Sequence, residues 1–165
     1  DIALKASLTG HLVFSTLHTN DAPSSITRLQ NMGTPNYLIS AALTLIMAQR
    51  LARRNCSECR EKDENVTPKL LNSIGFLPEQ SARAKIYKGK GCDQCSNTGY
   101  KGRMGVYEIL EIDKELKQGI LSDLSQAELN GIAKKNGFRT MQEMGHDLLL
   151  SGDLSYSEFE RVLQS

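Results

Sequence analysis

The chain has 165 residues, of which 39% are hydrophobic and 24% are charged, and its formal net charge is +1. This length and apolar content suffice for one domain with its own core, or one domain with a small appendage. The near-neutral charge excludes a broad basic field of the kind that binds nucleic acid. Residues 39–48 form the longest strongly apolar stretch, which is too short to span a membrane. We therefore expect no transmembrane segment and no signal peptide.

The first eight residues predict an amphipathic helix whose apolar side chains are Ile2, Leu4 and Leu8. These side chains need a partner surface that the helix alone does not specify. The chain also begins with Asp1 rather than an initiator Met. We therefore expect it to be a fragment of a longer protein.

Residues 10–18 predict a buried strand, because a glycine is followed by an apolar run rich in β-formers. His11 stands at the start of this strand and His18 at its end. The carboxyl ends of strands face the ligand crevice in an open α/β sheet, so His18 is well placed for a functional role. The alternative is structural, with both histidines bonded in caps or turns, and the residues alone favour it.

Two helices are expected after this strand. Asn20 or Asp21 can cap the first, and Pro23 fits its first turn. Pro35 begins the second helix, which we expect to run to Ala48. It is apolar on most sides, so the pattern predicts that it lies deep in the core.

A short basic run follows, made of Arg50, Arg53 and Arg54. A solvated surface explains it simply. A contact to a phosphate or to another subunit is the sharper alternative, because the planar guanidinium matches both phosphate and carboxylate.

The chain has four cysteines, arranged as two C-x-x-C pairs: Cys56, Cys59, Cys92 and Cys95. Two thiolates in one tight turn can hold a metal ion, and two such turns complete a tetrahedral shell of four sulfurs. Glycines around the second pair permit the backbone turns that such a site requires. The pattern predicts a structural zinc site, which stabilises a fold but has no open position to activate water.

Two alternatives compete with zinc. A scaffold with two disulfides suits a short secreted chain, whereas this chain can build a core unaided. A thioredoxin-like redox pair explains one C-x-x-C but not its duplicate. The 32 residues between the pairs exceed the roughly 15–20 of common zinc modules. Spacing and composition still favour zinc, and the cysteine usage points to a reducing cytoplasm.

The rest of the chain alternates short elements. Thr67 begins a short helix that Gly75 ends, residues 84–87 predict a strand, and residues 105–110 predict a strand that returns to the core. The remainder is helical, with capping boxes that begin at Ser125, Thr140 and Ser155. The phosphate-loop motif G-x-x-x-x-G-K-S/T does not occur, so this chain alone cannot cradle a triphosphate in that manner.

Several segments carry a family resemblance. They are residues 8–22 (LTGHLVFSTLHTNDA), 26–33, 48–56 (AQRLARRNC) and 99–108 (GYKGRMGVYE). Together with the four cysteines, they resemble the type II secretion and type IV pilus assembly (extension) ATPases, and residues 8–22 look like the histidine box of that family. Pilus retraction ATPases share this box but generally lack the cysteines, so the cysteines favour the assembly branch.

The resemblance implies an α/β fold: the C-terminal part of a RecA-like P-loop ATPase core, with a zinc module and a C-terminal helical subdomain. It implies that residues 1–54 end the core, residues 55–103 form the zinc-binding module, and residues 104–165 form the returning strand and the helical subdomain. The four cysteines match the family's zinc ligands one for one. His18, and less directly His11, take catalytic positions near the nucleotide γ-phosphate or the neighbouring subunit.

The resemblance also implies an activity and partners. Family members are cytoplasmic homo-hexamers, peripheral to the bacterial inner membrane, which use ATP and Mg²⁺ to drive pilin or pseudopilin assembly. The expected partners are an inner-membrane platform protein and a cytoplasmic docking protein, with no nucleic acid. The family's phosphate-loop lysine and catalytic glutamate have no counterpart here, so we expect this chain to bind Zn²⁺ but not to hydrolyse ATP.

Two alternatives of another class stay open. One is a stand-alone zinc-ribbon module that binds nucleic acid or protein, against which the near-neutral charge and 5% aromatic content count. The other is a helical tail that serves only as a contact surface, without chemistry.

Overall fold

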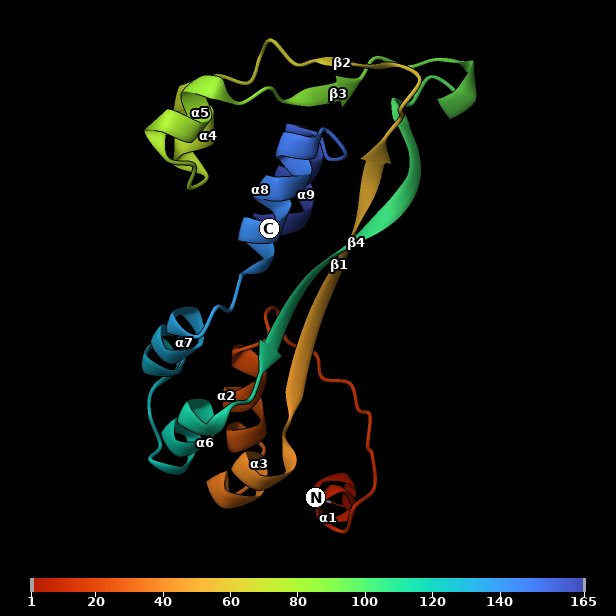
Figure 1. The fold of residues 1–165 in the computed structure, drawn as a ribbon. Helices are drawn as coiled ribbons and strands as arrows, with labels where there is room; N and C mark the ends of the chain where they lie inside the picture. Colours follow the sequence, from red (N-terminus) through yellow and green to blue (C-terminus); the bar gives the residue numbers. More distant parts are fainter. Residues whose placement is uncertain (1, 165) are drawn as a thin grey trace. The chain divides into compact units, whose positions relative to one another are not determined.

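The computed structural model describes residues 2–164 as a mixed α/β chain with two compact units. The first unit combines the residues up to Ala48 with Tyr107–Thr140. The second combines Gln49–Val106 with the residues from Met141 on. Figure 1 shows the elements of both units in chain order.

The longest strands pair with each other. They are β1 (Leu45–Asn55) and β4 (Tyr100–Glu111), and their arrows run in opposite directions in Figure 1. Along the second half of β4, the buried residues Val106, Glu108 and Leu110 alternate with exposed ones. This is the period of two that a strand with one covered face requires. The strand expected over residues 105–110 is therefore confirmed as part of β4.

The first unit is mainly helical. Its helices are α1 (Ile2–Leu8), α2 (Ser24–Asn31), α3 (Asn36–Ala42), α6 (Lys114–Leu121) and α7 (Gln126–Lys135). Helices α2, α3, α6 and α7 meet the end of β4 in one core, whereas α1 has no buried residue. The core contains Ala22, Ile26, Ile39, Leu110, Ile112, Leu116, Ile120, Leu129 and Ala133. The expected capping box of α7 is confirmed, because Ser125 and Glu128 bond each other's backbone N–H groups.

Two carboxylates fix the start of α2. Asp21 Oδ1 accepts the N–H of Ser24, the first residue of α2, at 2.7 Å, although Pro23 rather than Asp21 stands at the N-cap position. Glu108 is buried on β4, and its carboxylate accepts the N–H of Ala22. Glu108 thereby attaches the start of α2 to the strand that forms part of the same core.

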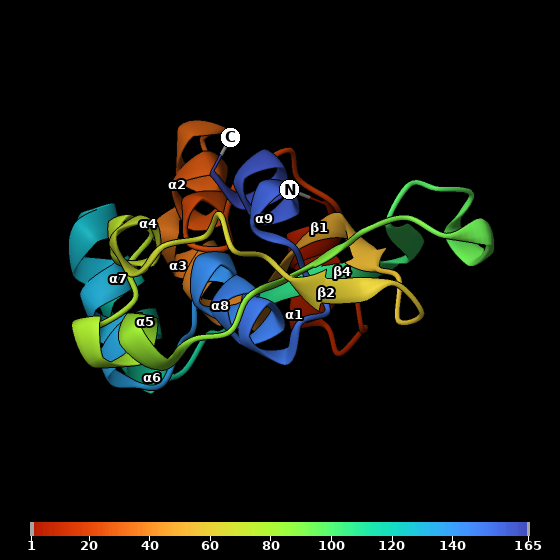
Figure 2. The same cartoon turned by 90° about the horizontal axis from the view of Figure 1, so that it is seen from above.

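The second unit contains a hairpin, two short helices and a helix pair. The antiparallel hairpin is β2 (Arg60–Lys62) with β3 (Tyr87–Gly89), and between these strands come α4 (Pro68–Ser73) and α5 (Pro78–Arg83). Figure 2 shows the hairpin running between these helices and the loops that carry the cysteines. The helix pair is α8 (Met141–Ser151) and α9 (Tyr156–Leu163).

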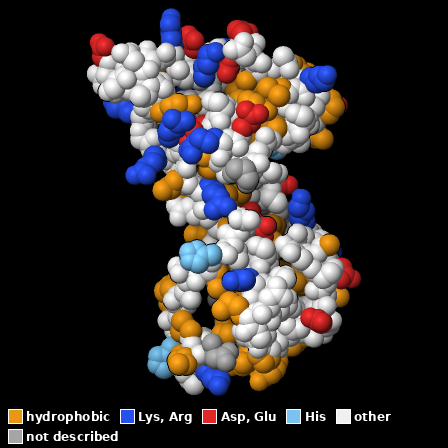
Figure 3. Space-filling model, turned by 180° about the vertical axis from the view of Figure 1, so that it is seen from behind, with side chains coloured by type: hydrophobic (Ala, Val, Ile, Leu, Met, Phe, Trp, Pro, Cys, Tyr) orange, Lys and Arg blue, Asp and Glu red, His pale blue; other side chains and the backbone are white. Residues whose placement is uncertain are grey.

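The expected strand at residues 10–18 is not formed. Residues 11–19 have no regular secondary structure, and no strand among residues 2–164 pairs with them. Leu12 and Phe14 are 82% and 87% exposed, so they lack the cover that a buried strand needs. Figure 3 shows hydrophobic side chains at the surface in its lower part, where Figure 1 places α1–α3. A strand is stable only when neighbours satisfy its backbone and cover its side chains, and here both are missing.

The prediction of one long helix from Pro35 to Ala48 is also wrong. Helix α3 ends at Ala42, Leu43 adopts an extended conformation, and strand β1 begins at Leu45. Only Ile39 and Ser40 of this helix are buried. A continuous apolar run does not distinguish a helix from a strand by its period, and here pairing with β4 decides the conformation.

The other short elements are close to expectation. Thr67 caps α4 by accepting the N–H of Leu70, as the sequence predicts. The strand expected at residues 84–87 forms slightly later, as β3. No helix within residues 2–164 is both long and apolar enough to cross a membrane.

The contact between α8 and α9 predicts a stability difference between two glycines. A Cβ added at Gly145 would lie 2.8 Å from Phe159 Cε2 and would also strike Leu163, whereas a Cβ added at Gly131 in α7 meets nothing within 4 Å. We expect Gly145→Ala to lower the free energy of unfolding by about 1–3 kcal/mol through overpacking. Gly131→Ala should be neutral or stabilising by up to about 1 kcal/mol. Urea unfolding followed by circular dichroism measures both, and equal losses would contradict the packing argument.

Candidate metal centre

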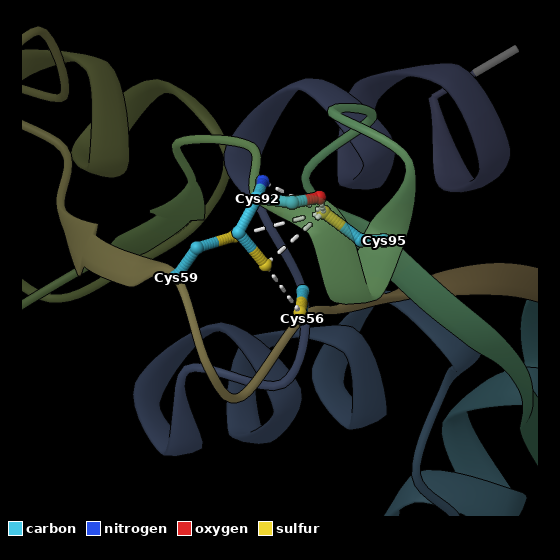
Figure 4. A group of neighbouring side chains, drawn as sticks. All are labelled: Cys56, Cys59, Cys92 and Cys95. Atoms are coloured by element: carbon cyan, nitrogen blue, oxygen red, sulfur yellow. Dashed lines mark hydrogen bonds between the residues drawn. The ribbon is translucent and has the colours of Figure 1, made fainter.

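The four cysteine side chains converge in the second unit (Figure 4). Sγ–Sγ distances are 3.9 Å for Cys56–Cys92 and 3.8 Å for both Cys59–Cys95 and Cys92–Cys95, and all four sulfurs lie within 4.8 Å of one another. A tetrahedral shell with Zn–S bonds of about 2.3 Å places its sulfurs about 3.8 Å apart. The cluster could therefore hold a metal ion. The sulfurs are too far apart for disulfides, and all four cysteines are free.

Each pair sits in a tight turn beside a strand. Cys56 follows the last residue of β1, and Cys59 directly precedes β2. The second pair is held by a short 3-10 helix, Asp93–Cys95, after which Ser96 and Asn97 adopt left-handed angles with φ of 51° and 60°. The chain thus reverses directly behind the second pair, and its sulfurs can face those of the first.

Backbone N–H groups surround two of the sulfurs. Gly91 donates to Cys59 Sγ at 3.2 Å, and Cys92 and Gly99 donate to Cys95 Sγ at 3.2 and 3.3 Å. Burial raises the pKa of Cys59 to about 11 despite its one donor. Burial also acts to raise the pKa of Cys95. Hydrogen bonds, first those from the backbone N–H groups of Cys92 and Gly99, outweigh burial and lower this pKa to about 6. The arrangement favours negative charge on Cys95, which is the form that binds a metal.

Two glycines let the backbone close around the cluster. A Cβ on Gly99 would lie 2.5 Å from the carbonyl oxygen of Gly89, and a Cβ on Gly89 would collide with Gly99 in turn. The contact is backbone against backbone, so neither side can yield. Gly99 also accepts the N–H of Cys56 at 2.9 Å, which aligns the first pair with the loop of the second.

A buried carboxylate lies near the end of β1. Glu158 is fully buried. Its carboxylate accepts hydrogen bonds from Arg53 Nε at 2.9 Å, from Arg53 Nη2 at 2.7 Å and from the Arg53 backbone N–H at 2.7 Å. Arg161 also bonds both of its oxygens. Burial acts to raise the pKa of Glu158, but the guanidinium groups of Arg161 and Arg53 hold it down at about 2. The Arg53 guanidinium lies 4.2 Å above the ring of Tyr100.

These contacts give two arginines of the basic run a role inside the second unit. Arg53 pairs with Glu158, and Arg54 pairs with Asp153 at 2.8 Å. The sequence alone predicts only solvent, a phosphate or another subunit as their surroundings. The expected capping box at Ser155 is half formed, because Glu158 donates its N–H to Ser155 Oγ while its carboxylate binds the arginines.

The histidines lie in different surroundings. His11 and His18 are exposed, and His11 Nδ1 is 3.1 Å from Thr9 Oγ1. Neither belongs to a metal-ligand cluster among residues 2–164. His146 is structural: its Nε2 is 2.9 Å from the carbonyl oxygen of Ile74, and its ring centroid lies 4.4 and 5.5 Å from those of Phe76 and Phe159.

The sequence matches a protein family model over nearly its whole length. The model described as "Type II/IV secretion system protein" matches residues 1–161, so the chain belongs to this family. The resemblance drawn from the histidine box and the cysteines is therefore confirmed.

Its relatives include proteins named for both kinds of system. The type IV pilus assembly ATPase PilB of Thermus thermophilus is 42% identical over 95% of this chain and 18% of that protein. The PilB of Pseudomonas aeruginosa is 41% identical over 98% of this chain and 28% of that protein. The type II secretion system protein HxcR of the same organism is 36% identical over 98% and 30%. The chain thus spans about a fifth to a third of the length of these relatives.

The buried Glu158 predicts an acid-dependent loss of stability. Its pKa in the folded chain, about 2, lies below the ordinary value of 4.5, so its contribution is complete above pH 4.5 and is lost as the pH falls toward 2. At pH 7 we expect Glu158→Gln to cost about 2–3 kcal/mol, less than a fully buried pair because Arg53 and Arg161 are half exposed. The difference between wild type and variant in urea unfolding should shrink between pH 5 and pH 2. A difference that does not change with pH would contradict this assignment.

Proposed function

We propose that this chain is the C-terminal part of a motor ATPase that couples ATP hydrolysis to the assembly of pilin or pseudopilin subunits. The observation that carries the proposal is the family match over residues 1–161, together with relatives named as type IV pilus assembly ATPases and type II secretion proteins. In the proposed parent protein, the phosphate loop, the acidic residues and the Mg²⁺ site belong to other residues. This part supplies the end of a RecA-like core over residues 1–54, a zinc module over residues 55–103, and a helical subdomain over residues 104–165.

The four cysteines are proposed to hold one structural Zn²⁺. The sulfur spacing fits a tetrahedral shell, and backbone N–H groups stabilise thiolate charge at Cys95. A closed shell of four protein ligands supplies folding energy rather than catalysis. The ion would therefore fix the two cysteine turns against each other.

The histidine box is proposed to act within the parent core. The exposure of Leu12, Phe14 and His18 supports a strand at residues 10–18 that pairs with neighbours supplied by the rest of the parent protein. His18, and less directly His11, would then face the nucleotide γ-phosphate or the adjacent subunit. An imidazole at that position could donate a hydrogen bond to charge that develops on the phosphoryl group.

The proposed setting follows from the same family assignment. The parent would act as a cytoplasmic homo-hexamer at the inner membrane, docked on a platform protein and a cytoplasmic docking protein, and it would bind ATP and Mg²⁺. Nucleic acid is not among the proposed partners. The chain's overall charge of +1 supports this exclusion.

The zinc proposal predicts a metal content of one ion per chain. Cys56→Ser should abolish tight zinc binding and unfold the cysteine turns, because apparent binding energies at structural sites are about 10–16 kcal/mol. Ser57→Ala is the matched control in the same turn: its hydroxyl bonds only Glu58 at 3.3 Å, so zinc should be retained. Elemental analysis of the purified chains measures the metal. Wild-type protein that holds no zinc after supplementation would contradict the proposal.

The motor proposal predicts that catalysis needs the parent protein. The 165-residue chain should show no ATP hydrolysis above background, and robust turnover would contradict its assignment as a part. In the full-length parent, we expect His18→Ala to lower kcat by about 10²-fold, the scale of one lost transition-state donor, and His11→Ala to lower it less. Steady-state phosphate release measures kcat, and size-exclusion chromatography verifies that each variant assembles as the wild type does. A full-length His18→Ala protein with unchanged kcat would remove the histidine from the mechanism.

A further inference from the structure

The turn between α8 and α9, residues 151–155, is held by the residues that flank the first cysteine pair. Asn55, which directly precedes Cys56, donates its backbone N–H to the carbonyl oxygen of Asp153 at 2.8 Å. Its side-chain amide donates to the carbonyl oxygens of Gly152 at 2.9 Å and Tyr87 at 3.1 Å. Asn55 is itself buried. One residue thus ties the α8–α9 turn and β3 to the start of the cysteine turn.

The residue on the other side of the first cysteine pair also contacts the α8–α9 turn. Arg60, which directly follows Cys59, donates to the carbonyl oxygen of Ser151 at 3.1 Å, and its guanidinium lies 5.2 Å from the ring centroid of Tyr87. Gly152 has φ of 77°, and a Cβ there would lie 2.9 Å from Tyr87 Cδ2. The α8–α9 turn therefore fits closely against the hairpin and leaves no room for a side chain at Gly152.

Three further contacts connect the same elements. Arg54 donates to Asp153 Oδ1 at 2.8 and 3.0 Å. Tyr100, at the start of β4, has its hydroxyl 3.0 Å from Ser155 Oγ. With the pairing of Arg53 and Glu158, the contacts reach from the α8–α9 turn into α9. Two of the residues that contact the α8–α9 turn, Asn55 and Arg60, are direct chain neighbours of cysteines, so their positions depend on the geometry of the cysteine turn.

We infer that metal binding by the four cysteines and docking of the α8–α9 turn form one coupled equilibrium. The inference rests on the proposed zinc site and extends the effect of the metal to the α8–α9 turn, which holds no cysteine. The metal orders the turn Cys56–Cys59, the ordered turn aligns Asn55 and Arg60, and these residues hold the α8–α9 turn. Loss of metal frees both flanks together and loosens the α8–α9 turn. Coupling is reciprocal, so a weakened α8–α9 turn also weakens metal retention.

Hydrogen exchange tests the forward direction on the whole 165-residue chain. Zinc-loaded protein is compared with protein stripped by a chelator, with zinc measured in both samples. We expect amides of residues 152–159 to exchange at least about tenfold faster after stripping, while α6 and α7 in the other unit stay protected. Bound zinc whose removal leaves residues 152–159 protected would overturn the coupling alone. Loaded protein that holds no zinc would overturn the zinc site and the coupling with it.

A matched pair of variants tests the reverse direction. Arg60→Gln removes the contacts to Ser151 and Tyr87, whereas Lys62→Gln on the same strand removes only an exposed pair with Glu64. We expect Arg60→Gln to release zinc to a colorimetric chelator about five- to tenfold faster than wild type, and Lys62→Gln to match wild type. If Arg60→Gln does not fold, Asp153→Asn takes its place, because it weakens the same turn through Arg54. Equal release rates for wild type and the docking variant would overturn the coupling.

Discussion

The pairing of β1 with β4 is the constraint on which the rest of the structure depends. At one end, the N–H of Ile112 bonds the carbonyl oxygen of Thr44 at 2.9 Å, and the core of the first unit forms around that end. At the other end, the N–H of Cys56 bonds the carbonyl oxygen of Gly99 at 2.9 Å. This second contact brings together cysteine pairs that are 32 residues apart in sequence. Closing the loop between the two cysteine pairs has an entropic cost, and the pairing of β1 with β4 closes it. The sulfurs then need only local turns to converge.

The candidate metal centre could be predicted from the sequence because its determinants are local. C-x-x-C spacing specifies a turn, and glycines near the second pair permit the backbone reversals. The pairing of Glu158 with Arg53 could not be predicted, because Arg53 lies 105 positions away and the Ser155-x-x-Glu158 pattern is also typical of a helix cap. The length of α3 was misjudged for a related reason, since an apolar run is compatible with either period until its strand partner is known. The cap of α7 at Ser125 was predicted correctly, because a cap bonds the backbone only a few residues away.

Residues of opposite charge meet where the end of β1 contacts α9 and the turn before it. Residues 49–106 contain twelve Lys or Arg and only six Asp or Glu. Asp153 and Glu158 lie outside this range, in the α8–α9 turn and in α9, and they add negative charge to the same unit. The arginines at the end of β1 meet these two carboxylates. Desolvation offsets much of the attraction in an ion pair with one buried partner, so the pair adds little net stability, whereas removal of one partner is destabilising. Phe159, Leu149 and Leu154 are fully buried in the same helix pair and its turn, and burial of such side chains stabilises a fold.

The exposed segment at residues 11–17 has a consequence for handling the chain in solution. It is rich in apolar residues and contains no proline, and its backbone lacks a neighbouring strand within residues 2–164. Such a segment is a template for edge-to-edge association between identical molecules. Leu12 and Phe14 are its most exposed apolar side chains. We therefore expect residues 11–17 to promote aggregation of the 165-residue chain at high protein concentration. A charged substitution at Phe14 would remove the most exposed apolar side chain of this segment.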